Sequence, residues 1–372
     1  MAETSKIVIL GGGVVGCSIA YYLSREGVKS TIIEREGIGS QASGYSVGGL
    51  NPLEGSHIPG QLAPLAIESY RMHADLWEWL KEETRICFQG RVTEMVTLAF
   101  SEAEIPGLFK SLEYFENASS DGFSGCWMDA KELLNLEPRL SSKLIGGALL
   151  RGNRALDSFE FTRALADAAG KRGVAFRHGL VETFKTDGNR VYRVILGDGE
   201  IDCEQVVLAA GPWSGQLVRC LNLDLPVEPL KGELLRMKLP GLRLPCDFIG
   251  DGFSIYAKPD GLVWCGTTEE WQGFDRKPSD SARASILKGA MRILPDIAKA
   301  ELIKHTACLR PMTTDAMPVI GRAPGWDNVF LATGAGRKGI LLSTGMGKSI
   351  TDLLTARTTE ISIEHCSPER YG

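Results

Sequence analysis

The chain has 372 residues, of which 44% are hydrophobic, and it carries a formal net charge of −5. This length predicts two or three domains with large cores. The negative charge gives no electrostatic basis for binding nucleic acid or an anionic membrane. The sequence lacks an apolar run of about 18 residues, so we expect no transmembrane helix.

The cysteines and histidines argue against a disulfide framework and against a metal site. Nine cysteines are scattered without a C-x-x-C pair, which predicts reduced thiols and a cytoplasmic setting. The five histidines are not at metal-ligand spacing from one another, so we expect no metal site. The first residues lead directly into an apolar strand, and we therefore expect no cleaved signal peptide.

A glycine-rich turn follows the first apolar segment. Residues 7–10 (IVIL) predict a strand that is buried on both faces. Gly11, Gly13 and Gly16 then fit G-x-G-x-x-G, whose glycines permit a tight turn, close approach to a pyrophosphate and close packing of helix on strand. The helix predicted for residues 14–25 would point its N-terminal N–H groups at the phosphates.

An acidic residue completes this pattern. A second apolar strand, residues 30–33, ends at Glu34, which is 18 residues past Gly16 and about where a carboxylate should meet a ribose hydroxyl. The negative charge of Glu34 disfavours a 2′-phosphate at that position. Strand, helix, strand and acid in this order predict dinucleotide binding, but they do not distinguish a nicotinamide cofactor from a flavin.

The following segments alternate between helical and strand-like patterns. Residues 37–55 are rich in glycine and serine and predict a loop along the path of a long dinucleotide. The periodicities predict helices at residues 62–83, 130–137 and 159–172, strands at 91–100, 174–186 and 204–209, and a hairpin turn at Asp187–Gly188.

The signs of a cofactor domain are dispersed over the chain. They fall in residues 7–55, in 174–215 and in a glycine-rich C-terminal stretch, whereas a nicotinamide dehydrogenase would usually complete this domain within about 150 contiguous residues. We therefore predict an α/β fold in which a discontinuous dinucleotide-binding domain is interleaved with a mainly antiparallel α+β substrate domain. The predicted boundaries are 1–83, 153–222 and 305–372 for the first domain, and 84–152 and 223–304 for the second.

Eight segments carry a family pattern in chain order: ILGGGVVG with IIERE, GIGSQAS with GGL, TLAFSE, VVLAAGPWSG, PLKGELL, YAKPDGLVWCGTTEE, LRPMTTDAMPVIGR and GAGRKGILL. Together they resemble the D-amino-acid oxidase-like superfamily of FAD-dependent oxidoreductases, and within it the glycine oxidase and sarcosine oxidase branch. The resemblance covers nearly the whole chain. It implies that the ligand is tightly held FAD, in a Rossmann-like domain of the glutathione-reductase type.

The resemblance also implies a set of FAD contacts, position by position. They are Gly11, Gly13, Val14, Val15 and Gly16 at the phosphate turn, Glu34 and Arg35 at the adenosine ribose, Ala42 and Ser43 in the next loop, Val47, Gly48 and Gly49 beneath the flavin, Val181 at the adenine, Ala210 and Gly211 in a second loop, and Ala335, Gly336, Arg337, Lys338, Gly339, Ile340 and Leu341 at the pyrimidine end of the ring. Backbone N–H groups in this last segment, at the start of a helix, would stabilise negative charge on the reduced flavin.

Enzymes of this branch oxidise a carbon–nitrogen bond, and the resemblance implies the same reaction here. The α-hydrogen of a small amino acid leaves as a hydride to flavin N5, and water hydrolyses the resulting imine. Glycine, sarcosine, a D-amino acid or a cyclic imino acid would each suit this reaction. No strong side-chain base is needed, so the protein contributes positioning and electrostatics.

Three residues match family positions near the substrate. Arg310 would bind the substrate carboxylate, because arginine offers a planar bidentate fork that lysine lacks, and Pro311 would stiffen the turn that carries it. Tyr256 matches a tyrosine near the carboxylate, and Arg337 matches an arginine near the flavin. The alternative for Arg310 is an ordinary arginine on the surface, and the alternative for Tyr256 is an ordinary residue of an amphipathic strand.

Two residues depart from the glycine oxidase pattern. Glu269 stands where glycine oxidases have an apolar residue, and it would either meet a cationic amine or a second polar group, or point to solvent. Cys308 stands where the sarcosine oxidase branch has a cysteine bonded to the flavin, with His305 three residues upstream; its alternative is a small buried apolar residue. We expect non-covalent FAD, as in the glycine oxidase branch.

Several functions remain open at this point. The leading one is an FAD-dependent oxidoreductase of small amino acids, which passes electrons either to oxygen, as an oxidase, or to another acceptor, as a dehydrogenase. The alternatives are a flavoprotein subunit that passes electrons to a partner in a larger complex, and a nicotinamide-linked dehydrogenase. The sequence does not name the amino acid, and it leaves open whether the protein forms a homo-oligomer.

Overall fold

The computed structural model describes residues 3–241, 243–355 and 357–371. The chain divides into two compact units. Unit 1 comprises Met1–Phe88, Asp157–Leu230 and Leu309–Gly372, and unit 2 comprises Gln89–Leu156 and Lys231–Cys308. The chain therefore passes between the units four times.

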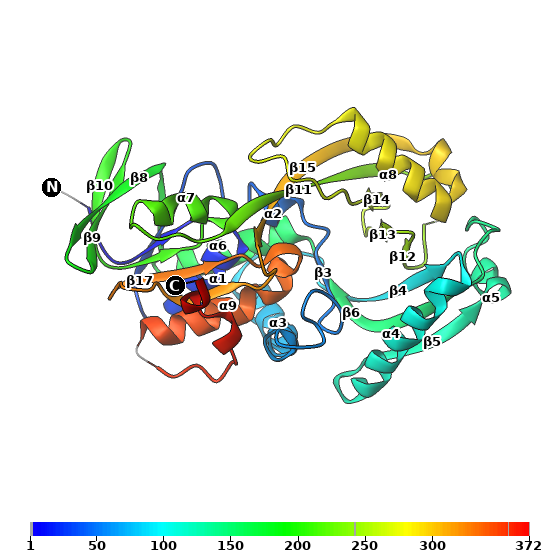
Figure 1. Cartoon of the computed structure of the whole chain (residues 1–372), viewed down its shortest axis with the longest axis horizontal. Coiled ribbons are helices and arrows are strands. Elements are labelled where there is room, and N and C mark those ends of the chain that lie inside the picture. Colours follow the sequence, from blue (N-terminus) through cyan, green and yellow to red (C-terminus); the bar gives the residue numbers. More distant parts are fainter. Residues whose placement is uncertain (1–2, 242, 356, 372) are drawn as a thin grey trace. The chain divides into compact units, whose positions relative to one another are not determined.

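Unit 1 is built on a largely parallel sheet (Figure 1). Its strand order is β16-β17-β10-β1-β2-β7, and the hairpin of β8 and β9 joins it through β10. Neighbours from β17 to β7 are parallel, whereas β16 is antiparallel to β17. The strands are β1 (Glu3–Leu10), β2 (Ser30–Glu34), β7 (Ala175–His178), β8 (Val181–Asp187), β9 (Arg190–Leu196), β10 (Gly199–Leu208), β16 (Val319–Arg322) and β17 (Val329–Thr333).

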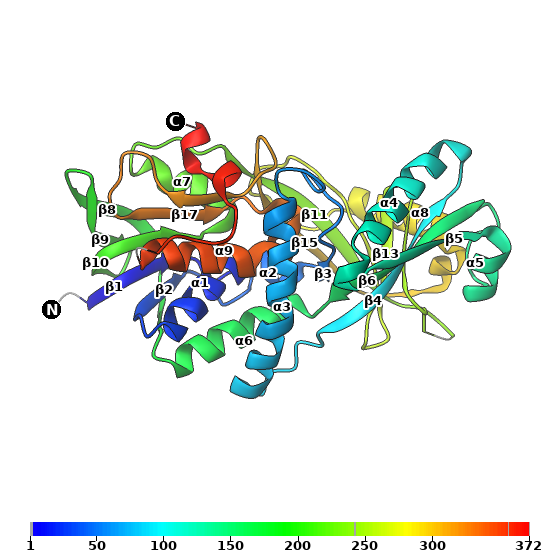
Figure 2. The same ribbon diagram turned by 90° about the horizontal axis from the view of Figure 1, so that it is seen from below.

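Helices bury the central strands of this sheet. Residues 7–10 of β1 are each at most 1% exposed, as expected for a parallel strand covered on both faces. Helix α1 (Val14–Arg25) connects β1 to β2 and packs against α6 (Ser158–Lys171) and α9 (Gly339–Leu354), which lie beside it in Figure 2. The other helices are α2 (Ala42–Tyr45), α3 (Ala63–Glu83) and α7 (Ser214–Arg219).

The glycine-rich segment 37–55 is not wholly a loop. It contains the four-residue helix α2 and the two-residue strand β3 (Gly49–Leu50). Elements this short contain too few residues to produce a helical or strand periodicity, so the sequence pattern could not reveal them. Similarly, β1 begins at Glu3 rather than Ile7, because its polar first half pairs with β10.

Unit 2 is built on a mixed, mainly antiparallel sheet. Its strand order is β15-β11-β14-β13-β12-β4-β6, and β5 pairs with β6. The strands are β4 (Arg91–Ala99), β5 (Ser124–Asp129), β6 (Gly146–Ala155), β12 (Asp247–Gly250), β13 (Phe253–Ala257) and β14 (Val263–Gly266), together with β11 (Val227–Lys238) and β15 (Glu301–Thr313), which also extend into unit 1. The helices are α4 (Ile105–Asn117), α5 (Ala130–Leu136) and α8 (Asp280–Ile293).

One face of the unit 2 sheet forms the core of that unit. Alternate residues of its strands, such as Leu235, Ile255 and Cys265, are fully buried and pack with Ile286 and Ala290 of α8. The residues between them point to the opposite face, because side chains alternate along a strand. This second face carries Arg236, Tyr256 and Trp264.

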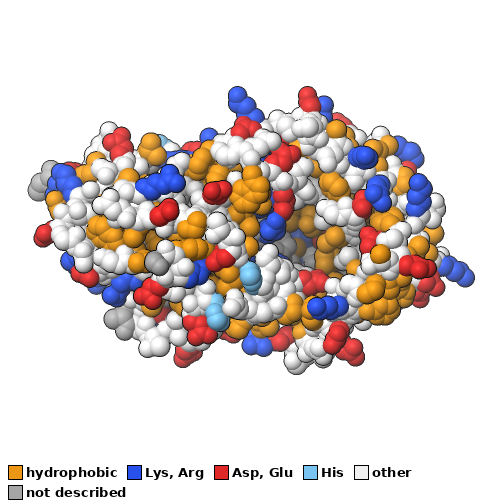
Figure 3. All heavy atoms as spheres, viewed as in Figure 1, with side chains coloured by type: hydrophobic (Ala, Val, Ile, Leu, Met, Phe, Trp, Pro, Cys, Tyr) orange, Lys and Arg blue, Asp and Glu red, His pale blue; other side chains and the backbone are white. Residues whose placement is uncertain are grey.

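The surface in Figure 3 shows no separation of charges by sign. On the face shown in Figure 3, basic and acidic side chains are intermixed rather than separated by sign. No helix in the described parts of the chain is long and apolar enough to cross a membrane.

Candidate active site

The turn after β1 is too tight for side chains at two of its glycines. Gly11 has a φ of +113°, and a Cβ built on it would lie 2.5 Å from the carbonyl oxygen of Ala209. A Cβ on Gly16 would lie 2.0 Å from the carbonyl oxygen of Gly11, because α1 packs directly on the turn. Both distances are far inside van der Waals contact, so the packing of the protein itself requires glycine at these two positions.

Gly13 differs from its two neighbours in the motif. Its φ of −76° and ψ of 176° are open to any residue. A Cβ built on it would meet only the Ser43 Oγ, at 3.3 Å. The protein therefore leaves a space at Gly13 that a larger side chain would fill, at the position where the motif brings the backbone close to a pyrophosphate.

The N-terminus of α1 lies at this space. Gly13 is its N-cap and makes no side-chain cap, and the first turn has no acidic residue. The backbone N–H of Val14 donates to Ser43 Oγ at 2.9 Å, which brings two predicted FAD contacts together. The helix dipole and the N–H groups that a helix leaves unpaired at this end favour an anion here.

The carboxylate of Glu34 lies beside the same turn. Its Oε2 accepts a hydrogen bond from the Gly12 N–H at 2.7 Å, and its Oε1 accepts one from the Glu36 N–H at 2.8 Å. The Glu34 carbonyl accepts from the Gly179 N–H at 3.0 Å, which brings the start of β8, and with it Val181, to this end of β2. These hydrogen bonds hold Glu34 at the end of β2, beside the glycine-rich turn.

Arg35 connects this region to the second predicted loop. Its guanidinium carbon lies 3.8 Å from the ring centroid of Trp213. Trp213 ends the 3₁₀ turn Gly211–Trp213, which directly follows Ala210. The contacts predicted at Arg35 and at Ala210–Gly211 therefore belong to one neighbourhood in unit 1.

A second helix N-terminus lies in the segment Ala335–Leu341. The 3₁₀ turn Gly336–Lys338 leads into α9, which has neither a side-chain cap at Lys338 nor an acidic residue in its first turn. Lys338 Nζ donates to the Asn51 carbonyl oxygen at 2.8 Å, which ties this segment to the chain just after Val47, Gly48 and Gly49. Desolvation lowers the pKa of Lys338 to about 8, against an opposing effect of Glu54.

Arg310 lies on a strand rather than in a turn. Both Arg310 and Pro311 belong to β15, so the prediction that Pro311 stiffens a turn is wrong. Proline is tolerated because β15 is an edge strand of its sheet. A β-bridge between Met312 and Ala335 brings the end of this strand next to the segment Ala335–Leu341. Arg310 is half-buried and Arg337 is exposed.

Tyr256 lies in a cross-strand row on the second face of the unit 2 sheet. It is paired with Trp264 of β14, and Trp264 is paired with Arg236 of β11. Residues paired directly in antiparallel strands project from the same face. The half-buried Tyr256 therefore shares this face with an indole and a guanidinium, in unit 2, whereas Arg310 belongs to unit 1.

Glu269 is exposed in a segment that a buried polar network holds in place. Its neighbour Thr268 accepts a hydrogen bond on Oγ1 from the Glu233 N–H at 3.1 Å. Its other neighbour, Glu270, exchanges two backbone hydrogen bonds of 3.0 Å with Lys231. The position of Glu269 therefore depends on β11, through residues that flank it.

The buried network itself was not expected from the sequence. Lys231 and Glu233 are both 0% exposed. Lys231 Nζ lies 3.2 Å from Glu233 and 2.7 Å from Asp275, and His305 Nε2 lies 2.7 Å from Glu233. Desolvation acts to lower the pKa of Lys231, but its hydrogen bonds to Asp275 and Glu233 outweigh this and raise it. The segment PLKGELL contained a signal for this network. Its apolar pattern predicts a buried strand, and Lys231 and Glu233 would be buried with it.

Comparison with known proteins decides the family. A model of the family described as "FAD dependent oxidoreductase" (DAO) matches residues 6–353. The chain belongs to this family of FAD-dependent oxidoreductases. FAD is therefore its cofactor, and the predicted fold class and enzyme class are confirmed.

The relatives of this family member align over its whole length. A glycine oxidase of Geobacillus kaustophilus is 29% identical over 374 residues, which cover 100% of this chain and 98% of that protein. A D-amino acid dehydrogenase of Paramagnetospirillum magneticum is 28% identical over 98% of this chain and 99% of that protein. The crystal structure of the Geobacillus kaustophilus glycine oxidase superposes with a TM-score of 0.92, at 28% identity, with all of both chains covered.

The residues of unit 1 fit the cofactor of the DAO family. The open space at Gly13 and the uncapped N-terminus of α1 suit a pyrophosphate, and Glu34 stands at the end of β2 where a ribose would lie. The uncapped N-terminus of α9 suits the electron-rich end of a flavin. The described residues contain no group of three or more His, Cys, Asp or Glu that could hold a metal ion.

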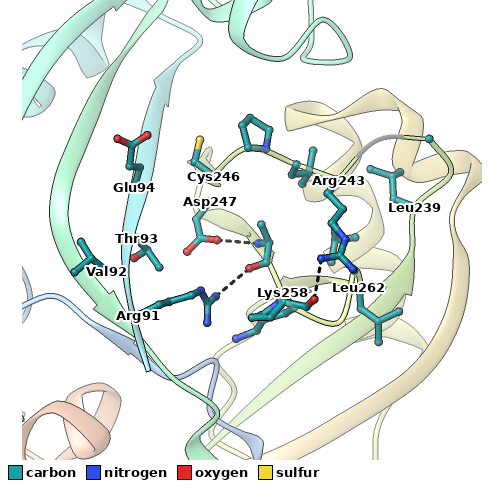
Figure 4. A pocket seen from close by; sticks show the side chains of 17 residues that line it. Arg91, Val92, Thr93, Glu94, Leu239, Arg243, Cys246, Asp247, Lys258 and Leu262 are labelled. Atoms are coloured by element: carbon teal, nitrogen blue, oxygen red, sulfur yellow. Dashed lines mark hydrogen bonds between the residues drawn. The ribbon is translucent and has the colours of Figure 1, made fainter. Parts of the chain in front are cut away.

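A separate cavity of about 470 Å³ lies in unit 2 (Figure 4). Asp247 accepts a hydrogen bond from the Ala257 N–H at 2.8 Å, and Arg91 donates to the Ala257 carbonyl at 3.2 Å. The two side chains thus satisfy the backbone at the end of β13, beside the start of β12. Burial raises the pKa of Asp247 to about 6. Tyr256 is not among the residues that line this cavity.

Proposed function

We propose that this enzyme oxidises the carbon–nitrogen bond of a small amino acid, such as glycine, sarcosine, a D-amino acid or a cyclic imino acid, to an imine that water hydrolyses. Full-length similarity to glycine oxidases and to a D-amino acid dehydrogenase supports this proposal. The observation that carries it is the bridge between Met312 and Ala335. This bridge brings the strand of Arg310 next to the segment Ala335–Leu341, which is predicted to contact the flavin. When bound, FAD supplies the acceptor for the hydride.

Unit 1 would be the FAD-binding domain and unit 2 the substrate domain. The turn at Gly11–Gly16, the carboxylate of Glu34 and the segments around Ser43, Gly211 and Lys338 would hold the cofactor, mostly through backbone N–H groups. All of them belong to unit 1. Unit 2 would contribute a wall of side chains, with Tyr256 on its second face.

Arg310 would bind the substrate carboxylate. A guanidinium can offer two parallel N–H donors to a carboxylate, and it stays charged at any pH at which the enzyme works. Tyr256, which matches a family tyrosine near the substrate, would be a candidate substrate contact on the second face of the unit 2 sheet. Arg337, three residues into the Ala335–Leu341 segment, would add positive charge near the flavin.

Glu269 would attract the substrate's amino group. It is exposed, and its position is determined by neighbours that bind β11. A carboxylate there would favour the approach of an ammonium, whose proton must be lost before the nitrogen can share its lone pair with the carbon that is oxidised. The side chain would therefore orient the amine rather than act as a strong base.

FAD would be held without a covalent bond. Cys308 is buried in β15, and His305, which would have to activate a bond to it, lies 2.7 Å from the carboxylate of Glu233. This contact keeps the imidazole of His305 beside the buried network. Acid precipitation should therefore leave the yellow colour in the supernatant. Colour that stays with the precipitate of the wild type but not of Cys308→Ala would contradict this assignment.

The relatives suggest two candidate electron acceptors. Oxygen would serve in an enzyme like the glycine oxidases, and another acceptor would serve in one like the D-amino acid dehydrogenase. We favour a cytoplasmic setting, because none of the nine cysteines forms a disulfide.

The proposal is tested by product formation. The purified enzyme is incubated with a panel of amino acids in air, and again without oxygen in the presence of an artificial electron acceptor, while ammonia is measured. Ammonia in air, with hydrogen peroxide, indicates an oxidase, and ammonia with the artificial acceptor alone indicates a dehydrogenase. Absence of ammonia under both conditions contradicts the proposed reaction.

A further inference from the structure

The cavity of about 470 Å³ in unit 2 is not used by the proposed function. All of the described residues that line it belong to unit 2, and they include neither Tyr256 nor Glu269. Its walls combine charged side chains with apolar ones, among them Leu239, Leu244 and Val263. This volume and this mixture of side chains are typical of a pocket that binds a small molecule.

Three charged side chains converge on one stretch of backbone in this cavity (Figure 4). Asp247 Oδ1 accepts from the Ala257 N–H at 2.8 Å, and Arg91 Nη2 donates to the Ala257 carbonyl at 3.2 Å. Arg243 Nη1 donates to the Pro259 carbonyl at 3.0 Å. Residues two apart in a chain are separated by at most about 7 Å. A carboxylate and two guanidinium groups are therefore anchored within the length of a small molecule.

The two guanidinium groups of the cavity retain hydrogen-bond donors. An arginine side chain has five N–H donors. Within the described parts of the chain, Arg243 uses one of them, on a backbone carbonyl, and Arg91 uses two, also on backbone carbonyls. The remaining N–H groups of each fork are able to bind a carboxylate of a ligand.

Asp247 adds a negative charge to the cavity. Its Oδ1 accepts from the Ala257 N–H, whereas its Oδ2 accepts no hydrogen bond from the described residues. Burial raises its pKa to about 6, and the hydrogen bond from Ala257 and the charges of Lys258 and Arg91 oppose this. The protein thus keeps a carboxylate in an unfavourable environment at the wall of a cavity, which is characteristic of a functional site.

The other ionisable groups of the lining have partners of their own or stay neutral. Glu94 forms a salt bridge of 2.8 Å with Arg151. The ammonium of Lys258 lies 4.3 Å from the ring centroid of Trp264. Burial raises the pKa of the Cys246 thiol to about 12, so this thiol is uncharged at neutral pH. Two positive groups and one negative group of the lining are therefore left to meet a ligand.

We propose that this cavity binds a free α-amino acid as a zwitterion, at a site that shares no residue with the one proposed for the oxidised substrate. Arg91 and Arg243 bind its carboxylate, and Asp247 Oδ2 accepts from its ammonium group. The apolar wall of the cavity favours an apolar side chain on the ligand. A simple anion would be repelled by Asp247, and a simple cation would face two guanidinium groups, so the zwitterion is the ligand that matches all three charges.

The test compares leucine with two analogues that each carry one of its charges. Isocaproate lacks the ammonium group, and isoamylamine lacks the carboxylate. Binding of each compound to the FAD-loaded enzyme is measured by titration calorimetry without oxygen, while the flavin spectrum reports any ligand beside the flavin. The variants are Arg243→Gln and Asp247→Asn. Arg283→Gln is the control, because it removes an exposed arginine of α8 that does not line the cavity.

Leucine should bind the wild type about 10- to 100-fold more tightly than either analogue, because each analogue loses charged hydrogen bonds. Arg243→Gln should weaken the binding of leucine and isocaproate by a similar factor, and it should not weaken that of isoamylamine. Asp247→Asn should weaken the binding of leucine and isoamylamine, and it should not weaken that of isocaproate. The control should bind all three compounds as the wild type does.

Three outcomes would overturn the inference. They are the absence of leucine binding, isocaproate that binds as tightly as leucine, and an affinity for leucine that survives both Arg243→Gln and Asp247→Asn. Each of them concerns binding to residues of unit 2 without turnover, so the proposed oxidation of an amino acid would still stand. Failure of that oxidation is recognised separately, by the absence of ammonia.

Discussion

The groups proposed to bind ligands differ in chemical type between unit 1 and unit 2. In unit 1 they are glycines, backbone N–H groups and two uncapped helix N-termini, with Glu34 as the main side chain. In unit 2 they are side chains on the second face of a sheet, whose neighbours depend on strand register. Backbone groups recognise a ligand common to a whole family, whereas side chains on strands can be exchanged without changing the fold. Under the proposed assignment, this chain would recognise its cofactor mainly through backbone groups and its substrate mainly through side chains.

The largest effect is expected for substitutions in the phosphate turn of unit 1. Gly16→Val should prevent stable folding of the turn and abolish FAD binding, because its Cβ would lie 2.0 Å from the Gly11 carbonyl oxygen. Gly13→Leu should instead fold but purify without FAD, because its side chain has room in the protein and fills the space expected for the pyrophosphate. Circular dichroism and flavin absorbance per chain distinguish the two outcomes.

Gly107→Leu is the control for both variants. Gly107 lies in α4 of unit 2, and a Cβ built there meets nothing within 4 Å. It should retain both fold and flavin. Full flavin content in Gly13→Leu would show that the pyrophosphate lies elsewhere.

The next effect concerns the buried network of unit 2. Lys231→Met should destabilise the protein by about 3–5 kcal/mol, because it leaves the buried carboxylate of Glu233 without its ammonium partner. Lys238→Met, on the same strand but exposed, should change stability by less than about 0.5 kcal/mol. Denaturant unfolding measures both. Equal stability of the two variants would show that Glu233 does not depend on the ammonium of Lys231.

A smaller effect is expected for the substrate carboxylate. Arg310→Lys should lose one of two parallel hydrogen bonds, each worth roughly 1.5–3 kcal/mol, and so lower kcat/KM about 10- to 100-fold. FAD content should not change. Steady-state kinetics with the best amino acid substrate compare Arg310→Lys with the wild type. Flavin absorbance per chain serves as the control for FAD content. Unchanged kinetics would indicate that the carboxylate is bound elsewhere, with Arg337 the next candidate.

The smallest effect is a pH dependence in unit 2. Burial raises the pKa of Asp247 to about 6, above its ordinary value of 3.8, so the folded protein holds this proton more tightly than the unfolded chain does. The contribution of Asp247 to stability is therefore present below pH 3.8 and is lost as the pH rises to about 6. Asp247→Asn should raise the Tm at pH 7.5 by about 2 °C and leave it nearly unchanged at pH 4. An equal shift at both pH values would show that titration of Asp247 is not the cause.

The sequence predicted the first helix and strands of unit 1 well because their signals are local. The strand, the glycines, the helix and Glu34 follow one another within 34 residues, and each has its own physical requirement. The long helices α3 and α6 were likewise predicted within about two residues of their ends, since their apolar stripes are periodic. The short elements α2 and β3 were missed because two to four residues carry no period.

The side-chain wall of unit 2 could not be predicted in the same way. Arg236 and Trp264 come from strands that are 28 residues apart in sequence, and only their register places them against each other. The salt-bridged network of Lys231, Glu233 and His305 depends on the same pairing. Pro311 was expected in a turn, since the sequence does not show that β15 lies at an edge where proline is tolerated.

The most direct test of the central claim is a titration of the purified enzyme with amino acids in the absence of oxygen, followed by the absorbance of the bound flavin. The account predicts about one FAD per chain without added cofactor, and full bleaching of the flavin by at least one small amino acid. It also predicts that Arg310→Lys, with the same amount of FAD, bleaches about 10- to 100-fold more slowly at low substrate concentration. A flavin that stays oxidised with every amino acid, in a protein that carries its full complement of FAD, would contradict the account.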